Sequence, residues 1–161
     1  MGAPTPQHVH RACADGYAAF DSAEAEAAAD ALLDCIMDYF VDGRAAFHPV
    51  DPLGSYRRQA QAARPYIARF AAERMPRYVR YFEQWLAHGG GAYVSGTHVC
   101  HVDIALFHAF RATEVQWGEA FRRMDDVPLF RAHGARMAQR PRIADYLASE
   151  RCQPFSGDSM M

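Results

Sequence analysis

Side chains able to bind a metal or act as nucleophiles crowd a six-residue stretch near the middle of the chain: His98, Cys100, His101 and Asp103. Imidazole, thiolate and carboxylate groups are the usual protein ligands of zinc and related transition metals. Side chains this close together at the start of a helix cannot all converge on one ion, because each turn of the helix points them in different directions. We therefore favour a role in folding for this group and expect no metal site.

The sequence also lacks a self-contained catalytic set. It has neither a serine, histidine and acid pattern around a nucleophile elbow nor a glycine-rich phosphate loop after a strand. No C-x-x-C pair is present among the cysteines, which argues against a zinc knuckle or a thioredoxin-type redox pair and predicts reduced thiols. We expect no catalytic residue in this chain. The cysteines are Cys13, Cys35, Cys100 and Cys152.

The same stretch has the spacing of a helix start. Cys100 stands at the N-cap position and Asp103 follows three residues later, which is the relation found in a capping box. Because a thiol is a weak hydrogen-bond acceptor, Asp103 should carry most of the capping, with its carboxylate at the positive end of the helix dipole. Residues 102–110 are then apolar on nearly every side. This pattern predicts a central helix buried inside a bundle.

Length and charge limit the class of protein. A chain of 161 residues can form one domain with a sizeable core. Its formal charge of −2 argues against a nucleic-acid partner, which requires a basic surface. No run approaches the roughly 18 apolar residues of a membrane helix, and the N-terminus does not have the pattern of a signal peptide. We expect a cytoplasmic protein without nucleic-acid or membrane partners.

The spacing of apolar residues predicts an all-α fold, a bundle of about five helices around the central one. Residues 1–20 should be a lead-in, residues 21–152 the helical domain and residues 153–161 a tail. A first long helix should begin at Asp21 and end near Gly43. Its aspartates recur every four residues, which indicates one solvated face. They are Asp30, Asp34, Asp38 and Asp42.

Prolines and glycines mark the remaining boundaries. The segment between Phe47 and Tyr56 should separate the first two helices. Pro76 should kink the second helix or start a new one after Met75, because proline offers no backbone donor. The glycines that begin at residue 89 should end that helix in a left-handed turn. Two short helices should follow the central one, the second opening at Pro141.

Three segments, in order, resemble the C-terminal helical domain of cytosolic glutathione transferases. The run AYVSGTHVCHVDIALF is similar to the glycine and capping box that precede that family's buried sixth helix, with Cys100 in place of the usual serine or threonine. The segment ERMPRYVRYFEQWLAHGG resembles the fifth helix, and ARMAQRPRIADYLASERCQPF resembles the closing helices. The likeness covers nearly the whole chain and is strongest to bacterial and sigma-like members.

The resemblance implies a domain that forms the wall of a hydrophobic electrophile site, in a family that uses glutathione as co-substrate. We find no likeness to the thioredoxin-like half that activates glutathione, so we expect no conjugation by this chain alone. By resemblance, Asp34, with Asp38 as its rival, should contact the glutathione amino group. Phe40, Arg44 and Phe155 should line the electrophile site.

An alternative function also follows from the resemblance. The same helical domain recurs as a docking piece in translation-factor and tRNA-synthetase assemblies, so this chain could be a non-catalytic interaction module. A helical half without its thioredoxin-like half should expose apolar surface, and exposed apolar patches mark partner sites. The partners we expect are a second copy of the chain or a separate thioredoxin-like domain.

Overall fold

The computed structural model describes Phe20 and residues 22–156. Within these residues it contains no β-strand, only isolated bridge residues such as Tyr93 and Gly96, which pair with each other. The predicted all-α class is therefore confirmed. The helices are α1 (Ala23–Phe47), α2 (Tyr56–Arg69), the π-helical segment η1 (Phe70–Arg74), α3 (Met75–His88), α4 (His101–Gln116), α5 (Gly118–Arg122), α6 (Pro128–Ala138) and α7 (Pro141–Leu147).

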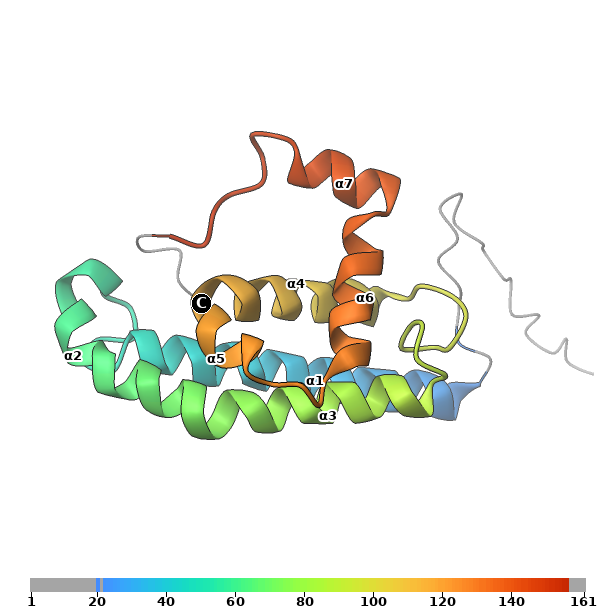
Figure 1. The fold of residues 1–161 in the computed structure, drawn as a ribbon, viewed down its shortest axis with the longest axis horizontal. Helices are drawn as coiled ribbons and strands as arrows, with labels where there is room; N and C mark the ends of the chain where they lie inside the picture. The colour runs from blue at the N-terminus through green and yellow to red at the C-terminus, as the bar shows by residue number, and fades with distance from the viewer. Residues whose placement is uncertain (1–19, 21, 157–161) are drawn as a thin grey trace, which may run out of the picture.

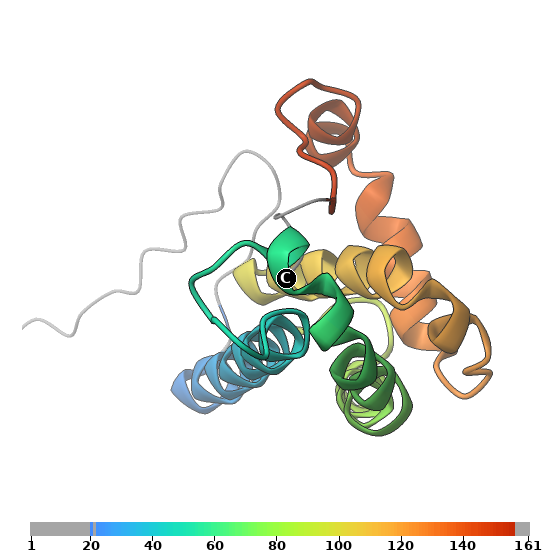
Figure 2. The same cartoon turned by 90° about the vertical axis from the view of Figure 1, so that its left-hand side faces the viewer.

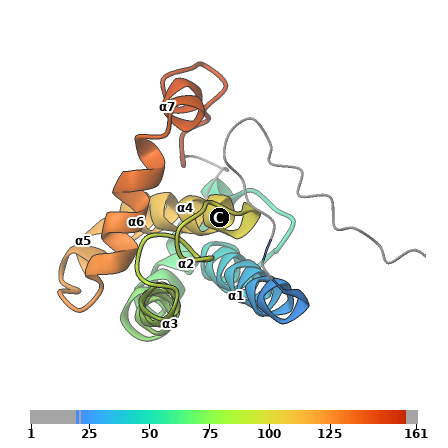
Figure 3. The same cartoon turned by 90° about the vertical axis from the view of Figure 1, so that its right-hand side faces the viewer.

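The helices form a bundle with α4 at its centre. Figure 1 shows α1 and α3 lying side by side along the long axis, with α4 over them and α6 crossing α4 at a steep angle. The end-on views in Figures 2 and 3 show α1, α3 and α4 as three neighbouring rods, with α6 beside α4. Direct packing of α4 on α1 and on α6 agrees with this arrangement. The central position expected for this helix is confirmed.

Both ends of α1 differ from their expected positions. The Oγ atom of Ser22 accepts a hydrogen bond from the Ala25 amide at 3.1 Å, so Ser22 is the N-cap; Asp21 lies outside the described residues. At the other end, α1 continues through Gly43 to Phe47. A glycine inside a helix costs about 0.5–1 kcal/mol, whereas burying a phenylalanine contributes about 1.5–3 kcal/mol. Because Phe47 is only 2% exposed, its burial outweighs the cost of Gly43.

A widened turn precedes Pro76. As expected, a new α-helix starts there: α3 begins at Met75 and has the proline in its first turn. The Met75 amide donates to the carbonyl of Phe70, five residues back, which is the π-helical spacing. Since proline cannot donate a hydrogen bond, a change of helical register at this point is the expected response. Further along, the expected left-handed turn is present, with φ of 89° at Gly90 and 85° at Gly91.

Tyr39 joins the helices at the middle of the core. Its side chain is fully buried, and its hydroxyl oxygen lies 2.6 Å from Thr113 Oγ1. The Thr113 hydroxyl donates to the Ala109 carbonyl at 2.7 Å, so Tyr39 is left to donate to Thr113. This hydrogen bond ties α1 to α4 inside the core. The Tyr39 ring also contacts the rings of Phe40, Phe70, Tyr78, Phe82 and Trp117.

The Asp103 carboxylate is fully buried and accepts three hydrogen bonds. Its Oδ2 atom accepts from the Cys100 amide at 2.8 Å, and the reciprocal half of the capping box is also present. Its Oδ1 atom accepts from the Val94 amide at 2.9 Å and from His133 Nε2 at 2.8 Å. His133, on α6, is fully buried too. One side chain therefore joins the glycine turn, the start of α4 and the middle of α6.

The helices α4 and α6 cross in close contact at Gly134. A Cβ atom added to this glycine would lie 2.3 Å from Cδ1 of Phe110 on α4. The Phe110 ring also packs against Phe121 and Phe130, with centroid distances of 6.0 and 5.6 Å. Only a residue without a side chain fits at position 134 while Phe110 keeps this position.

One strip of α4 is exposed, so the expectation that this helix is buried on nearly every side is wrong there. Ile104 is 44% exposed, and His101 and His108 share its exposure. These residues are three and four positions apart, so they lie on one face of the helix. The neighbouring helices cover the other faces of α4 and leave this one open between α1 and the C-terminal segment.

We predict that Asp103→Ala lowers the free energy of unfolding by about 3–5 kcal/mol, because it leaves three buried donors without their acceptor. Cys100→Ser should leave stability unchanged or raise it slightly, since a hydroxyl caps the helix better than a thiol. Urea titration of both variants measures these changes. Asp125→Ala, which removes an exposed aspartate, serves as control and should fall within about 0.5 kcal/mol of the parent. A stable Asp103→Ala variant would contradict the capping role.

Candidate functional site

Three rings form a stack on the exposed strip of α4. The imidazole of His108 lies between Phe40 of α1 and Phe155 of the C-terminal segment, with ring centroids 5.1 Å and 5.3 Å away. Figure 1 shows the chain after α7 turning back toward α4. The ring contact with His108 places Phe155 of this segment beside the helix. Phe40 and Phe155 are half-buried, while His108 keeps an exposed edge. The three rings together form a partly exposed aromatic surface.

Arg111 lies one turn beyond His108 and holds the C-terminal segment in place. Its guanidinium carbon lies 5.5 Å from the centroid of the Phe155 ring, within range of a cation–π interaction. Its NH2 group also donates to the sulfur of Cys152 at 3.4 Å. Such a cation–π contact contributes about 0.5–1 kcal/mol at an exposed position. The stack therefore carries one positive charge beside an otherwise aromatic surface.

The pKa of His108 is lowered from its usual value. The main cause is desolvation by the surrounding side chains, among them the rings of Phe40 and Phe155, and the second is the positive charge of Arg111. An unperturbed histidine has a pKa of about 6.5, so a lowered pKa keeps His108 neutral at pH 7. A neutral imidazole can stack on an aromatic ligand and accept or donate one hydrogen bond.

Of the site residues that the resemblance predicts, some come together in the structure and others do not. Phe40 and Phe155 come together through His108, as described above. Arg44, one turn farther along α1, is exposed and donates from NH2 to the Pro52 carbonyl at 3.1 Å. Asp34 is exposed on α1, as is its rival Asp38. The structure therefore joins the two phenylalanines in one surface but turns the Arg44 guanidinium toward the loop that follows α1.

Sequence reasoning missed His108 and Arg111 as parts of this surface. Their signal was spacing: Ile104, His108 and Arg111 follow one another at intervals of four and three residues, so they share one helix face.

Sequence reasoning also grouped Asp42 with solvated aspartates, although Asp42 accepts hydrogen bonds from Arg74 and from Tyr78, the latter at 2.8 Å. Burial alone would raise the pKa of Asp42, but these hydrogen bonds outweigh it and lower the pKa.

Cys100 is not suited to act as a nucleophile or metal ligand. Burial, followed by the nearby charge of Asp103, raises the pKa of its thiol to about 12. The thiolate is the reactive and metal-binding form, so Cys100 is held in the inert thiol form. His101 lies with its Nε2 atom 3.5 Å from Asp30 Oδ1. Within residues 20 and 22–156, no three histidine, cysteine or acidic side chains are grouped as a metal site would require.

Comparison with known proteins gives a match to one domain family. The family model described as "Glutathione S-transferase, C-terminal domain" matches residues 46–150, which is more than half of the chain. The matched range runs from the last turn of α1 to just beyond α7. A search of individually curated proteins found no match. No helix in the part of the chain that the structure describes is both long and apolar enough to cross a membrane.

We predict that the His108 ring titrates below pH 6.5 in the folded protein, as measured by NMR. Phe155→Ala should raise this midpoint by rehydrating the ring, and Arg111→Gln should raise it by removing a positive charge. Arg122→Gln removes the same charge from α5 and should leave the midpoint unchanged. Because protonation then favours the unfolded chain, the contribution of His108 to stability is full above its unfolded pKa and declines as the pH falls below it. A midpoint at or above 6.5 would contradict the stacked arrangement.

Proposed function

Because this chain belongs to the glutathione S-transferase family, through its C-terminal domain, we propose that it forms the wall of the site that receives the hydrophobic electrophile. The observation that carries the proposal is the stack of Phe40, His108 and Phe155, with Arg111 beside it. Aromatic surfaces of this kind bind planar ligands through offset or edge contacts. In this proposal the protein acts in the cytoplasm and glutathione is the co-substrate.

The proposed reaction is conjugation of glutathione to an electrophilic carbon. The glutathione thiolate forms a bond to this carbon, and a leaving group departs with the electron pair of the bond that breaks. The stack holds the ring of the electrophile, and the charge of Arg111 favours a substrate with a substituent whose oxygens carry partial negative charge, such as a nitro group. Activation of the thiol requires a partner half, for which a thioredoxin-like domain is our proposal. We assign activation of the glutathione thiol to none of the side chains in the stack.

The proposed contact for glutathione itself is an exposed carboxylate of α1. Asp34 is our choice, with Asp38 as the alternative, because a carboxylate complements the positively charged amino group of glutathione. Both lie on the solvent-facing side of α1. Arg44 can contribute to the electrophile wall only if it leaves the Pro52 carbonyl, so we assign it a secondary place there.

A second copy of the chain is the partner that the surface of α1 and α3 favours. Met37 and Val41 are 50% and 65% exposed and lie one turn apart on α1. A small cavity of about 190 Å³ lies on α3 and the end of η1, and Arg74 in its lining contacts Asp42 of α1. Its lining is aromatic at Tyr78 and Tyr81 and basic at Arg74 and Arg77, although Arg74 already pairs with Asp42 of the same chain. A two-fold dimer would place the acidic α1 of one copy near this basic surface of the other. The same surface supports the alternative function as an interaction module.

We expect the purified chain to conjugate glutathione to 1-chloro-2,4-dinitrobenzene no faster than buffer does. It should nevertheless bind the reaction product, S-(2,4-dinitrophenyl)glutathione, with an affinity measured by calorimetry. Phe40→Ala and Phe155→Ala should each weaken that binding roughly three- to tenfold, because each removes one aromatic contact. Tyr146→Ala removes an exposed aromatic ring from α7 and is the control. Turnover well above the blank, or product binding insensitive to both variants, would contradict the proposal.

We also predict that the chain is a dimer in light scattering after size-exclusion chromatography. Val41→Arg should convert it to a monomer, because the new positive charge would face the basic surface of the second copy. Val115→Arg makes the same change at a valine of α4 that is 58% exposed, and it should leave the dimer intact. A parent protein that runs as a monodisperse monomer would argue against both the dimer and the interaction module.

A further inference from the structure

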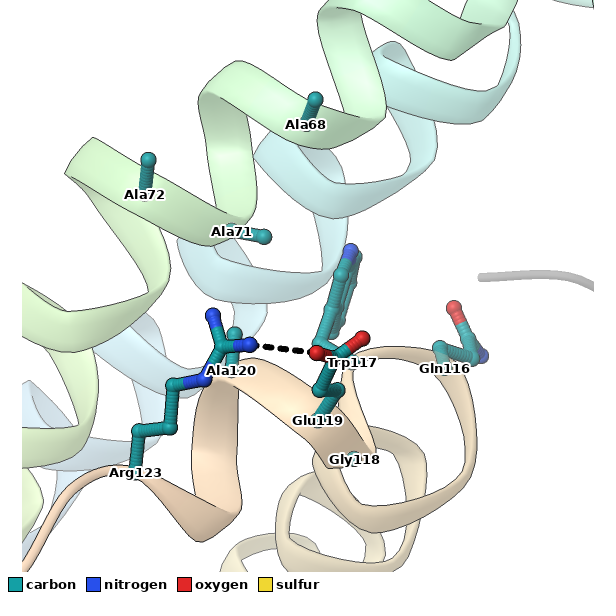
Figure 4. Close-up of a pocket in the computed structure, with 9 residues that line it drawn as sticks. All are labelled: Ala68, Ala71, Ala72, Gln116, Trp117, Gly118, Glu119, Ala120 and Arg123. Atoms are coloured by element: carbon teal, nitrogen blue, oxygen red, sulfur yellow. Dashed lines mark hydrogen bonds and ion pairs between the residues drawn. The ribbon is translucent and has the colours of Figure 1, made fainter.

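The rod formed by α2 and η1 has exposed apolar surface along it and at its start. Along the rod, an open cleft of about 500 Å³ separates it from α5, with a wall made of Ala68, Ala71 and Ala72 (Figure 4). The charged residues that line this cleft, Glu119 and Arg123, form an ion pair with each other. At the start of the rod, in the loop before α2, the exposed side chains are larger and the surrounding charge is mainly positive.

This loop, residues 48–55, projects two large aliphatic side chains into solvent. Leu53 is 94% exposed and Val50 is 72% exposed, the highest values among the large hydrophobic residues that the structure describes. Pro52 lies between them and is exposed as well. A single exposed leucine is ordinary, but neighbouring apolar side chains at one tip form a patch that a partner can cover.

The loop is fixed from the inside by Gln59, a residue only 8% exposed. The Oε1 atom of Gln59 accepts hydrogen bonds from the Val50 and Asp51 amides at 3.0 and 3.2 Å, and its Nε2 atom donates to the Asp51 carbonyl at 2.9 Å. The Leu53 amide donates to Asp51 Oδ1 at 3.0 Å. These hydrogen bonds use the polar groups of the loop within the protein, so the aliphatic side chains are the part that it offers to a partner.

Arginines surround the apolar tip. Residues 44–69 contain five arginines and one acidic residue. Arg44 reaches the tip from α1, where its NH2 group donates to the Pro52 carbonyl at 3.1 Å. Arg57 and Arg58 are exposed in the first turn of α2, which Figure 1 shows at one end of the long axis of the molecule. This end is therefore basic, although the chain as a whole carries a formal charge of −2.

We propose that this loop and the start of α2 bind the surface of a bilayer that contains anionic lipids. Val50 and Leu53 would enter the boundary of the hydrocarbon layer, and the arginines would pair with the lipid phosphate groups. An aliphatic tip fits a bilayer better than single-stranded nucleic acid, which is bound by aromatic side chains that stack on the bases. It also fits a bilayer better than a folded protein, because a protruding tip needs a matching pocket in a protein but not in fluid lipid.

Surface attachment of this kind differs from the expectation that the chain has no membrane partner. That expectation rested on the lack of a run of apolar residues long enough to span a bilayer, and binding at the surface requires no such run. Because one small apolar tip gives weak affinity, the arginines must supply a second attraction. Binding should therefore be reversible and sensitive to salt. It does not depend on the proposed role in glutathione conjugation.

Cosedimentation of the full chain with lipid vesicles tests the proposal. The chain should bind vesicles of phosphatidylcholine with about 30% phosphatidylserine, and bind pure phosphatidylcholine about tenfold more weakly. Leu53→Ser should weaken binding to the mixed vesicles about fivefold, because it removes the largest side chain of the tip. Arg57→Gln combined with Arg58→Gln should weaken it about tenfold, and high salt should release the parent protein.

Two matched variants serve as controls and should bind as the parent does. Val115→Ser removes a valine of α4 that is 58% exposed. Arg142→Gln combined with Arg151→Gln removes two exposed arginines on and after α7, which lies away from α2 in Figure 1. Thermal melting establishes that each variant is folded.

The proposal is overturned if the chain does not bind the mixed vesicles. It is also overturned if either Leu53→Ser or the Arg57 and Arg58 double variant binds them as tightly as the parent. Binding of poly(uridylic acid) without binding of vesicles would overturn it in favour of a nucleic-acid partner.

Discussion

The buried carboxylate of Asp103 is the interaction on which the rest of the structure depends. Placing an ionised group where no solvent reaches it is costly unless hydrogen bonds replace the lost water. Here the replacements come from three separate parts of the chain, namely the Val94 amide, the Cys100 amide and His133 of α6. The carboxylate is satisfied only when all three parts are in place. It therefore couples the start of α4 to the position of α6.

The position of α4 in turn decides where the chemistry of the molecule lies. This one helix presents His108 and Arg111 on its open side, buries Leu106 and Phe110 on the others, and ends at Gln116. Two members of the proposed electrophile wall are thus attached to one rigid element. The wall does not contain Asp103, yet it relies on the orientation that the hydrogen bonds of Asp103 impose on the start of the helix.

Local signals made much of the fold predictable from sequence. Pro141 and Pro76 marked helix starts because proline restricts its own backbone wherever it occurs. The continuation of α1 to Phe47 was missed because it depends on burial against distant helices, which outweighs the local preference of Gly43. The partnership of Asp103 with His133 was missed for the same reason, since thirty residues separate them in sequence. Contacts made only by the folded chain leave no local signal.

The candidate site was less predictable than the fold. Family resemblance suggested Phe40 and Phe155, but only the folded chain shows that His108 lies between them. Where the C-terminal segment returns onto α4, Arg111 contacts both Phe155 and Cys152. The helical spacing of His108 and Arg111 can be read from the sequence. That the neighbouring helices leave this face of α4 open cannot, because it depends on how the helices pack.

The crossing at Gly134 limits how this sequence can vary. Alanine is a better helix former than glycine by about 1 kcal/mol, so helix propensity alone would favour alanine at this position. The Phe110 ring lies where the added methyl group would be. The side-chain size allowed at position 110 thus depends on the residue at position 134, and the reverse also holds. A larger side chain at one position requires a smaller one at the other. In evolutionary terms, positions 110 and 134 are one unit of variation shared between two helices.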